Sequence, residues 1–319
     1  MAGEIEAARA ARAARPAGSA PTIALAGAVD PAVLRAAGWS LRGVLSGDPY
    51  VDRLDAATYV HPAELCADPR IDAVAVDGSD RDLTALLPEL RASGLLLLLP
   101  TADPQDVALV RLAHQVPDSA DACVGLLRRW EPWTVTVAAA LPLAAGPPVQ
   151  MTVRGWPRGR QAAAELVDLV AAWCGDVVAA VATPAILPAA ELPGGAVVSW
   201  ALLTASGATV LVSHEGEQES VRLSFATARL VAGPSGVGWE GGAHLPLGAG
   251  QPAPTRAFPQ ALDPGLVSVA AALAGAVGGG DVAADAWPWP ADLGDLLAVS
   301  RVLSALRTSA RTEVLVPIA

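Results

Sequence analysis

Apolar residues in the first 120 positions come in short runs that alternate with amphipathic segments. The runs are almost wholly apolar, as expected for strands buried on both faces of a sheet. Strands are expected at 22–29, 40–46, 71–78 and 95–99. Helices are expected at 30–38, 61–69, 80–94 and 104–116. Because strands and helices alternate, the pattern predicts a Rossmann-like parallel sheet domain over 21–120.

After residue 120 the pattern changes to consecutive strands with few helices. Strands are expected at 133–141, 148–156, within 195–216 as a pair joined at 205–207, at 220–233 and at 312–318. Helices are expected at 160–175 and 292–309, where apolar side chains recur on one face. We therefore expect an α+β domain over 121–319 with a large, mostly antiparallel open sheet.

Two segments could be mistaken for a membrane span or a secretory signal. The five leucines at 95–99 are far too few to cross a bilayer, which takes about 20 residues, so they indicate a buried strand. Residues 1–20 are rich in alanine and arginine and lack the apolar core of a secretory signal. They predict an N-terminal arm, which is a disordered tail or, alternatively, a segment that docks on a partner.

Composition narrows the function classes. The net charge is −11, which argues against nucleic-acid binding. All 21 basic residues are arginine, and lysine and asparagine are absent, so Schiff-base chemistry is excluded. The simplest explanation for the absence of lysine and asparagine is a GC-rich genome. Cys66, Cys123 and Cys174 are widely spaced, which predicts reduced, buried thiols in the cytoplasm. No histidine spacing supports a metal site.

Four segments, taken in order, carry a family resemblance: 67–76, 171–182, 200–216 and 295–318. From about Ile23 to Leu315 the chain resembles the Gfo/Idh/MocA family of NAD(P)-dependent oxidoreductases. The resemblance implies a dinucleotide-binding Rossmann domain followed by a domain whose open sheet face often packs against a second subunit.

The family's chemical positions are changed in this chain. Members usually carry Glu-Lys-Pro at the end of the fourth expected strand, where this chain has Leu98 and Leu99 before Pro100. Of the family's Asp-xxx-His pair, Gln161 and Glu165 occupy the matching positions. Glu165 is the candidate catalytic acid or base, and a solvated helix residue is the alternative.

The cofactor loop is also altered. A GxGxxG loop brings a helix N-terminus to a pyrophosphate, but here the stretch is "GAVDPA", with Gly27 and Ala28 kept as candidate cofactor contacts. Asp30 in this loop would repel phosphates. Ser46, with Asp48 nearby, stands where an acidic residue would hold the ribose.

A further candidate site is the segment "RGWPRGR", where Arg154 and Arg158 flank Trp156. Guanidinium groups and an indole are suited to an anionic or aromatic ligand, and a surface loop is the alternative.

These observations predict a family-like protein that has lost redox catalysis. We expect a structural or regulatory subunit without cofactor or metal, paired as a homo- or heterodimer through its sheet face, possibly with an active homologue, and without nucleic acid or membrane. The alternatives are an NAD(P)-dependent oxidoreductase that still binds its cofactor, or a non-redox enzyme that uses Glu165 in the old cleft.

Overall fold

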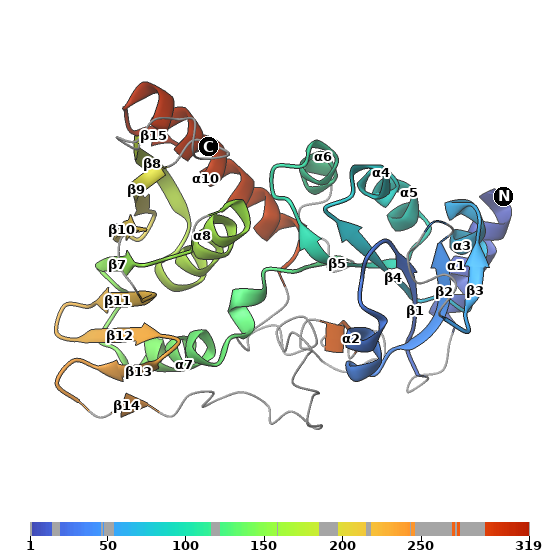
Figure 1. Cartoon of the computed structure of the whole chain (residues 1–319), viewed down its shortest axis with the longest axis horizontal. Coiled ribbons are helices and arrows are strands. Elements are labelled where there is room, and N and C mark those ends of the chain that lie inside the picture. The colour runs from blue at the N-terminus through green and yellow to red at the C-terminus, as the bar shows by residue number, and fades with distance from the viewer. Residues whose placement is uncertain are drawn as a thin grey trace. The chain divides into compact units, whose positions relative to one another are not determined.

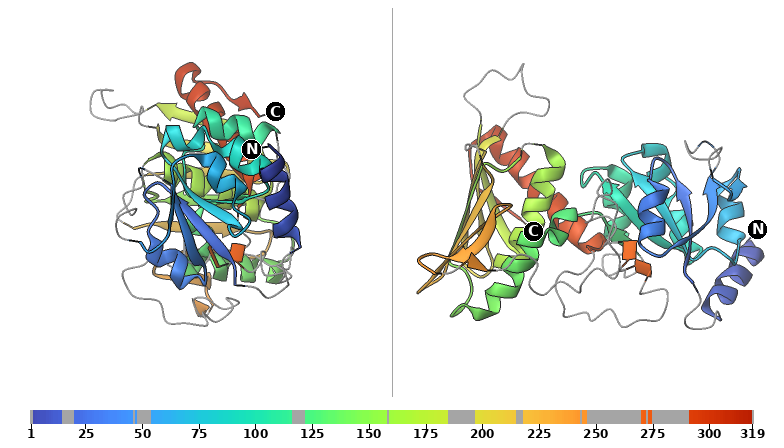
Figure 2. Two further views of the ribbon diagram at one scale, coloured as in Figure 1. Left: turned by 90° about the vertical axis from the view of Figure 1, so that its right-hand side faces the viewer. Right: turned by 60° about the horizontal axis from the view of Figure 1, so that its bottom comes forward.

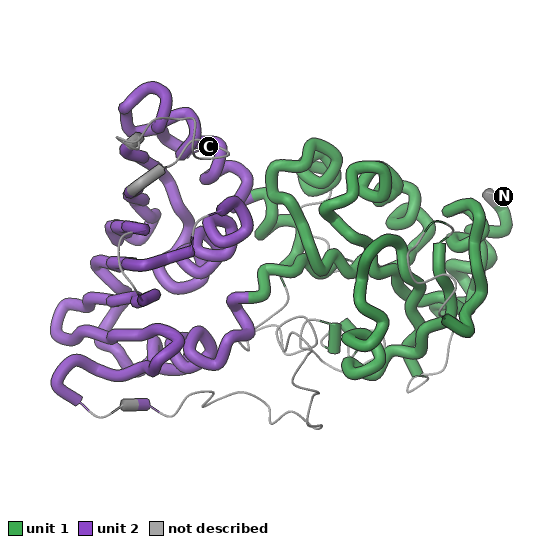
Figure 3. Tube along the Cα trace, viewed as in Figure 1, with its two compact units in different colours: residues 1–127, 256–297 green, residues 128–255, 298–319 purple. Residues whose placement is uncertain are grey.

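The structure of the protein is a computed structural model. It describes residues 2–14, 20–45, 47, 54–115, 122–157, 159–184, 197–214, 218–242, 244–245, 270–271, 273–274 and 291–318. The chain forms two compact units: Met1–Leu127 with Arg256–Leu297, and Arg128–Thr255 with Ala298–Ala319 (Figure 3). The first unit thus takes in residues 256–297, which the sequence assigned to the second domain.

The first unit is built on a six-stranded parallel sheet (Figure 1). Its strands are β1 (Thr22–Ala26), β2 (Ser40–Leu45), β3 (Ala57–Tyr59), β4 (Ala73–Gly78), β5 (Leu96–Ala102) and β6 (Ala122–Val124). The order β3-β2-β1-β4-β5-β6 is that of doubly wound dinucleotide-binding folds. The expected Rossmann-like sheet is confirmed, although the short strands β3 and β6 carry too little apolar sequence to have been predicted.

Helices connect these strands. They are α1 (Ala2–Ala13), α2 (Pro31–Ala36), α3 (Pro62–Ala67), α4 (Arg81–Thr84), α5 (Leu87–Ala92) and α6 (Val107–Gln115). The single helix expected at 80–94 is wrong, because Pro88 cannot continue a preceding helix and instead stands in the first turn of α5.

The N-terminal arm was expected as a disordered tail or a partner-docking segment, but its described part, residues 2–14, is largely helical and packs within the first unit. α1 packs on α3, with Ala8 buried. The Arg12 guanidinium donates hydrogen bonds to the carbonyl oxygens of Cys66 (2.6 Å), Asp68 (3.0 Å) and Ser93 (2.8 Å), which lie at the ends of α3 and α5. A cation here satisfies carbonyls that two helices leave without partners, so the arm belongs to this unit.

The leucine run forms most of β5. Leu97, Leu98 and Leu99 have no exposed surface, and β5 pairs with β4 and β6 on its two sides. The run is a central strand buried on both faces, as predicted.

The second unit contains a nine-stranded sheet, mostly antiparallel, in which β7 and β10 are the parallel pair. Its order is β14-β13-β12-β11-β7-β10-β9-β8-β15. The strands are β7 (Gln150–Arg154), β8 (Val177–Pro184), β9 (Val197–Thr204), β10 (Thr209–Ser213), β11 (Ser220–Ser224), β12 (Arg229–Gly233), β13 (Gly236–Trp239), β14 (His244–Leu245) and β15 (Val316–Pro317). The predicted open antiparallel sheet is confirmed.

One face of this sheet is covered by helices α7 (Pro132–Ala140), α8 (Arg160–Cys174) and α10 (Leu293–Thr312) (Figure 2). Buried side chains such as Met151, Val153, Val221 and Leu223 point toward these helices, and the residues between them point to the other face. Alternation along each strand therefore gives the sheet one packed face and one open face.

The strand expected at 133–141 is wrong, since this segment is α7. Glu131 precedes Pro132, which suits the first turn of a helix. Thr136 donates its hydroxyl to the Pro132 carbonyl at 2.8 Å, within the helix. The segment is apolar on all sides and buried, and periodicity alone does not separate such a helix from a strand. The final strand is likewise shorter than expected, because α10 runs to Thr312.

Among the helices in the described part of the chain, none combines the length and apolarity needed to span a bilayer.

Candidate functional site

The loop between β1 and α2 stands where a dinucleotide-binding fold cradles a pyrophosphate. Gly27 has φ +97°, and a Cβ atom there would lie 2.6 Å from Leu83 Cδ1 and 2.7 Å from Asp77 Cβ. Glycine is therefore required for the chain to pass close to β4. The predicted contacts Gly27 and Ala28 thus lie at the carboxyl end of β1.

The backbone N–H groups of this loop are bonded within the chain. The Ala28 N–H donates to the Asp77 carboxylate, the Val29 N–H donates to the Gly27 carbonyl at 2.8 Å, and the Ala32 N–H donates to Asp30 Oδ1 at 2.8 Å. Pro31 has no N–H to offer. The donors that would hold a phosphate are already satisfied, and the carboxylates of Asp30 and Asp77 accept two of them.

Asp77, at the end of β4, was missed by the sequence analysis. Its Oδ1 accepts hydrogen bonds from the Ser79 hydroxyl (2.6 Å), the Ser79 N–H (3.0 Å) and the Thr101 hydroxyl (2.7 Å). Burial acts to raise the pKa of Asp77, but these hydrogen bonds and that from Ala28 outweigh it, so the pKa is lowered. Asp77 is therefore a fixed anion beside the loop.

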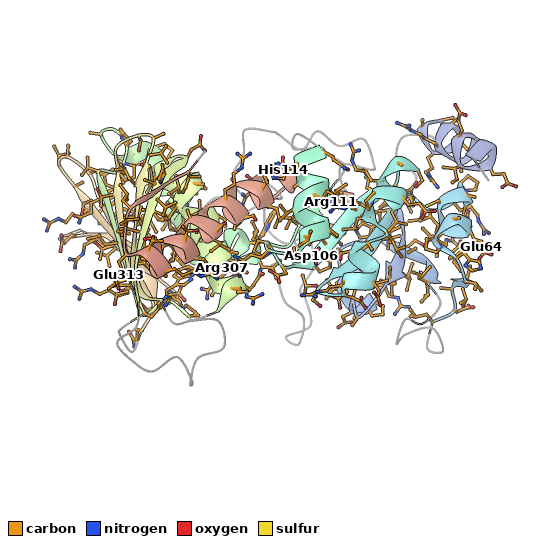
Figure 4. The ribbon with its side chains drawn as sticks, turned by 90° about the horizontal axis from the view of Figure 1, so that it is seen from above. Glu64, Asp106, Arg111, His114, Arg307 and Glu313 are labelled. Atoms are coloured by element: carbon orange, nitrogen blue, oxygen red, sulfur yellow. The ribbon has the colours of Figure 1, made fainter. Side chains whose placement is uncertain are left out.

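The helices that follow β4 and β5 are capped in the same way. Asp80 accepts from the Asp82 and Leu83 N–H groups at the start of α4. Asp106 accepts from the Ala108 and Leu109 N–H groups at the start of α6, and Figure 4 shows it at the end of that helix opposite His114. Each of these N-termini thus carries its own anion, which opposes a phosphate group.

The end of β5 offers no polar group at the positions that match the family's glutamate and lysine. Leu98 and Leu99 are fully buried there. Ser46, the predicted ribose contact, lies outside the described residues.

In the second unit, Glu165 lies on the first half of α8. Gln161, one turn earlier, donates from Nε2 to Glu165 Oε1 at 3.2 Å. The Glu165 side chain is only 12% exposed, and its Oε2 lies 3.6 Å from Arg128 Nε. Glu165 is therefore a half-buried carboxylate with partners, whereas the alternative was a solvated helix residue.

Arg128 gathers three carboxylates from separate elements. Its Nη1 lies 2.8 and 2.9 Å from the two oxygens of Glu219 and 3.2 Å from Glu131 Oε2, while its Nε faces Glu165. Arg128 belongs to the 3-10 helix η2 (Leu127–Trp130), Glu131 precedes α7, and Glu219 precedes β11. We call Arg128, Glu131, Glu165 and Glu219 the Arg128 cluster.

Indole rings flank the Arg128 cluster. The Arg128 guanidinium lies 4.8 Å from the centre of the Trp156 ring, and Trp133 donates from Nε1 to Glu131 Oε2 at 2.5 Å. Trp133 packs edge-to-face against Trp156 and Trp173. A cation over a buried indole is held more firmly than one in water, so the rings help to fix Arg128.

The cluster has the chemistry of an acid/base site. Burial raises the pKa of Glu219, and the Arg128 guanidinium offsets only part of that effect. Burial acts against the charge of Arg128, but the surrounding carboxylates prevail and raise its pKa. One cation among three carboxylates neutralises only part of their negative charge, so Glu219 binds a proton more readily than an ordinary glutamate.

A second ion pair lies beside the cluster. Arg129 and Asp168 are 2% and 3% exposed, and Arg129 Nε donates to Asp168 Oδ2 at 2.6 Å, with a further contact between Arg129 Nη2 and Asp168 Oδ1. This pair joins η2 to the middle of α8. It is fully enclosed by side chains, so its role is structural.

The predicted group of Arg154, Trp156 and Arg158 is divided by the fold. Trp156 is 1% exposed among the helices on the packed side, and its Nε1 donates to the Ala162 carbonyl at 2.7 Å. Arg154 points to the open face, since the neighbouring Val153 points inward. Arg158 lies outside the described residues.

No group of three or more His, Cys, Asp or Glu side chains suited to a metal ion occurs among the residues that the structure describes. The three cysteines are buried and unpaired, and burial raises the pKa of Cys123 and Cys174 to about 12.

Comparison with solved structures places this fold among NAD-binding dehydrogenases. An NAD-binding oxidoreductase from Klebsiella pneumoniae superposes with a TM-score of 0.70 at 15% identity, covering 94% of this chain and 100% of the other. Levoglucosan dehydrogenase in complex with NADH and levoglucosan gives 0.66 at 13% identity, with 93% and 99% covered. A myo-inositol dehydrogenase from Corynebacterium glutamicum gives 0.65 at 16% identity, with 94% and 99% covered.

The chain has the fold of the Gfo/Idh/MocA oxidoreductases. The resemblance expected from the sequence therefore holds for the fold over nearly the whole chain. No protein-family model and no curated protein sequence matches it.

The neighbours in complex with NADH raise the question of whether this chain fits that cofactor. The loop after β1 does not fit a pyrophosphate in the usual way, because its N–H groups are bonded to Asp30, Asp77 and Gly27.

Proposed function

We propose that this protein is a non-catalytic relative of NAD-binding dehydrogenases, which acts as a structural or regulatory subunit beside an active homologue. The observation that carries the proposal is the loop between β1 and α2. Its donors are bonded within the chain, and two aspartates stand where a pyrophosphate would bring negative charge. The apolar end of β5 and the ion-paired state of Glu165 also support it.

The test is calorimetric titration of the purified protein with NADH and with NADPH. NAD(P) is the first ligand to test, since solved neighbours are complexes with NADH. We expect no binding at millimolar cofactor. Micromolar binding would overturn the proposal and restore an NAD(P)-dependent oxidoreductase.

A matched variant, Asp77→Ala, sharpens this titration. It removes the anion and releases the Ala28 N–H, while the Gly27 backbone stays in place. If this variant binds the cofactor and the wild type does not, the loop between β1 and α2 is the reason why the wild type has lost cofactor binding. Thermal unfolding of both proteins checks that the variant is folded.

The Arg128 cluster favours a second candidate, a non-redox enzyme with Glu165 as acid or base. Support comes from the partly buried carboxylates and the raised pKa of Glu219. The test is a screen of levoglucosan and myo-inositol, which the names of the neighbours supply, for conversion with and without NAD(P). An activity that is unchanged in the Glu165→Gln variant would show that Glu165 is not the catalytic acid or base.

We also propose that the protein works in the cytoplasm, where its three buried thiols stay reduced.

A further inference from the structure

Arg154 was predicted from the sequence as a ligand contact, and the fold gives it different neighbours from the predicted ones. It ends β7, and its exposed side chain lies on the sheet face opposite to the helices of that unit (Figure 2). Among the described residues, its guanidinium has no hydrogen-bond or ion-pair partner. A guanidinium whose donors are unused is suited to receive an anion.

Hydroxyl side chains flank Arg154 on both sides along one row across the sheet. Antiparallel pairing places Ser220 of β11 opposite Arg154, and the parallel register of β7 with β10 brings Ser213 to its other side. The row continues through Ser199 of β9 to Thr183 of β8. We call these five residues the Arg154 row. Because neighbouring strands lie about 4.8 Å apart, its hydroxyls follow the guanidinium at regular steps.

The hydroxyls of this row are not needed within the sheet. Those of Ser220, Ser199 and Thr183 form no hydrogen bond with another side chain or backbone group in the part of the chain that the structure describes. The next row along the same strands is more apolar, with Leu211 of β10 between Thr152, Ala201 and Val181. The Arg154 row is therefore a polar strip beside an apolar one, with donors and acceptors left for a ligand.

A shallow hollow of about 360 Å³ lies along this strip. Arg154 and the hydroxyl side chains of Ser213, Ser199 and Thr183 line it, and Leu211 adds an aliphatic wall. Its volume is near the lower end of the range for small-molecule sites, about 300–1,000 Å³. The ligand of such a hollow is small, with an anionic group near the guanidinium and polar groups along the row.

A second arginine lies within reach of the same anion. Arg222 of β11 is opposite Thr152, which makes it a diagonal neighbour of Arg154 on the same face. Diagonal neighbours lie about 7–8 Å apart, within reach of long side chains. Glu240 is 4.0 Å from Arg222 but 3.3 Å from Arg229, so it holds Arg222 only loosely. Two guanidinium groups suit a doubly charged phosphate better than a single carboxylate.

We propose that the Arg154 row binds a small organic phosphate whose carbon chain carries hydroxyl groups. Arg154 and Arg222 hold the phosphate, and Ser213 and Ser199 meet the hydroxyls. This proposal goes beyond the proposed function and does not depend on it, because α8, which carries Glu165, covers the other face of the sheet (Figure 2).

The test is calorimetric titration of the purified protein with glycerol 3-phosphate, inorganic phosphate and glycerol. We expect glycerol 3-phosphate to bind, inorganic phosphate to bind more weakly, and glycerol not to bind. Arg154→Ala should weaken the binding of glycerol 3-phosphate by about tenfold or more, because charge-assisted hydrogen bonds are lost. Arg154→Lys should recover only part of the affinity, since it keeps the charge without the planar fork.

Two further variants separate the contributions of charge and hydroxyl groups. Arg301→Ala removes an exposed arginine of α10, outside the hollow, and should leave the affinity nearly unchanged. Ser199→Ala should weaken the binding of glycerol 3-phosphate but not that of inorganic phosphate, which does not reach along the row. Thermal unfolding of each variant checks that it is folded.

Four results would overturn the proposal. They are no binding of glycerol 3-phosphate at millimolar concentration, equal binding by the wild type and Arg154→Ala, an equal loss in Arg301→Ala, and an unchanged affinity for glycerol 3-phosphate in Ser199→Ala. The proposed function fails separately. NADH binding that Arg154→Ala leaves unchanged would overturn the proposed function without bearing on the Arg154 row.

Discussion

The helix caps of the first unit and the buried ion pairs of the second hold their carboxylates in different ways. Around the six-stranded sheet, Asp30, Asp80 and Asp106 each accept from backbone N–H groups two or three residues further along. In the second unit, Arg128 and Arg129 reach carboxylates 91 and 39 residues away, in Glu219 and Asp168. Local caps secure single helices, whereas the long-range pairs secure the packing of helices on a sheet.

The difference teaches where the stability of each unit is concentrated. A cap contributes about 1 kcal/mol and its loss frays one helix end. A buried pair whose partners lie on different elements leaves an uncompensated charge in the interior when one partner is removed. The predicted effects of substitution should therefore decrease from the second unit to the first.

The largest effect is expected for Arg129→Ala. This change leaves the Asp168 carboxylate, 3% exposed, without its guanidinium. We expect a loss of about 3–5 kcal/mol in the free energy of unfolding, measured with urea. The double variant Arg129→Ala, Asp168→Ala should lose much less than the sum of the two single changes, and simple additivity would contradict the pairing.

A smaller loss, about 2 kcal/mol, is expected for Arg128→Ala, because its carboxylates are only half-buried and water reaches part of the cluster. Because Trp156 and Trp133 contact the cluster, the substitution should also change the tryptophan fluorescence of the folded protein. Burial already raises the pKa of Glu219, and removing Arg128 raises it further. The difference in the free energy of unfolding between the wild type and Arg128→Ala should therefore shrink as pH falls and Glu219 takes up a proton.

Arg128→Lys is the matched control for this change. It keeps a positive charge but loses the fork that holds Glu219 and faces Glu165, so it should recover only part of the stability. Full recovery would show that charge alone fixes the cluster.

The comparison is sharpened by Asp68, whose partners lie within nine residues. Its carboxylate accepts from the Tyr59 hydroxyl at 2.6 Å and from Arg70 Nη2 at 2.7 Å. Burial acts to raise the pKa of Asp68, but these hydrogen bonds lower it from 3.8 to about 2. Because the folded value is the lower one, this stabilisation is complete above pH 4 and is lost as pH falls through 2.

Asp68→Asn should therefore cost about 2 kcal/mol at pH 7, and the difference from the wild type should narrow between pH 4 and pH 2. Urea unfolding over that pH range is the measurement. A difference that stays constant with pH would mean that the shape of the side chain matters more than its charge.

The same contrast between local and distant partners explains what the sequence predicts. Both sheets follow from apolar runs and alternation, and the sequence Asp30-Pro31 is typical of the start of a helix, with Asp30 as its N-cap. The α7 segment was predicted as a strand because a helix buried on all sides has no polar face to reveal its period. The docking of α1 depends on Arg12 meeting carbonyls more than 50 residues away, which no local pattern shows.

The candidate site divides in the same manner. Glu165 was named as a candidate because the family resemblance assigns its position on α8, and its role stays a prediction. Arg128, Glu131 and Glu219 were missed, since nothing near Glu219 in the sequence indicates that it meets an arginine 91 positions earlier. Asp77 had a usable signal, namely an aspartate directly after a buried strand, at the edge where ligands bind in such sheets.

The smallest effect in this series belongs to the caps, and Asp106→Ala is the most direct test. Asp106 Oδ1 accepts from the Ala108 and Leu109 N–H groups at 2.9 and 3.0 Å, with no distant partner among the described residues. Its removal should cost about 1 kcal/mol and increase amide exchange in the first turn of α6 alone. Asp106→Ser should recover most of this loss, because a hydroxyl also accepts from the N-terminal N–H groups. A loss as large as that of Arg129→Ala would show that this carboxylate, too, holds elements together, and the contrast between the units would then fail.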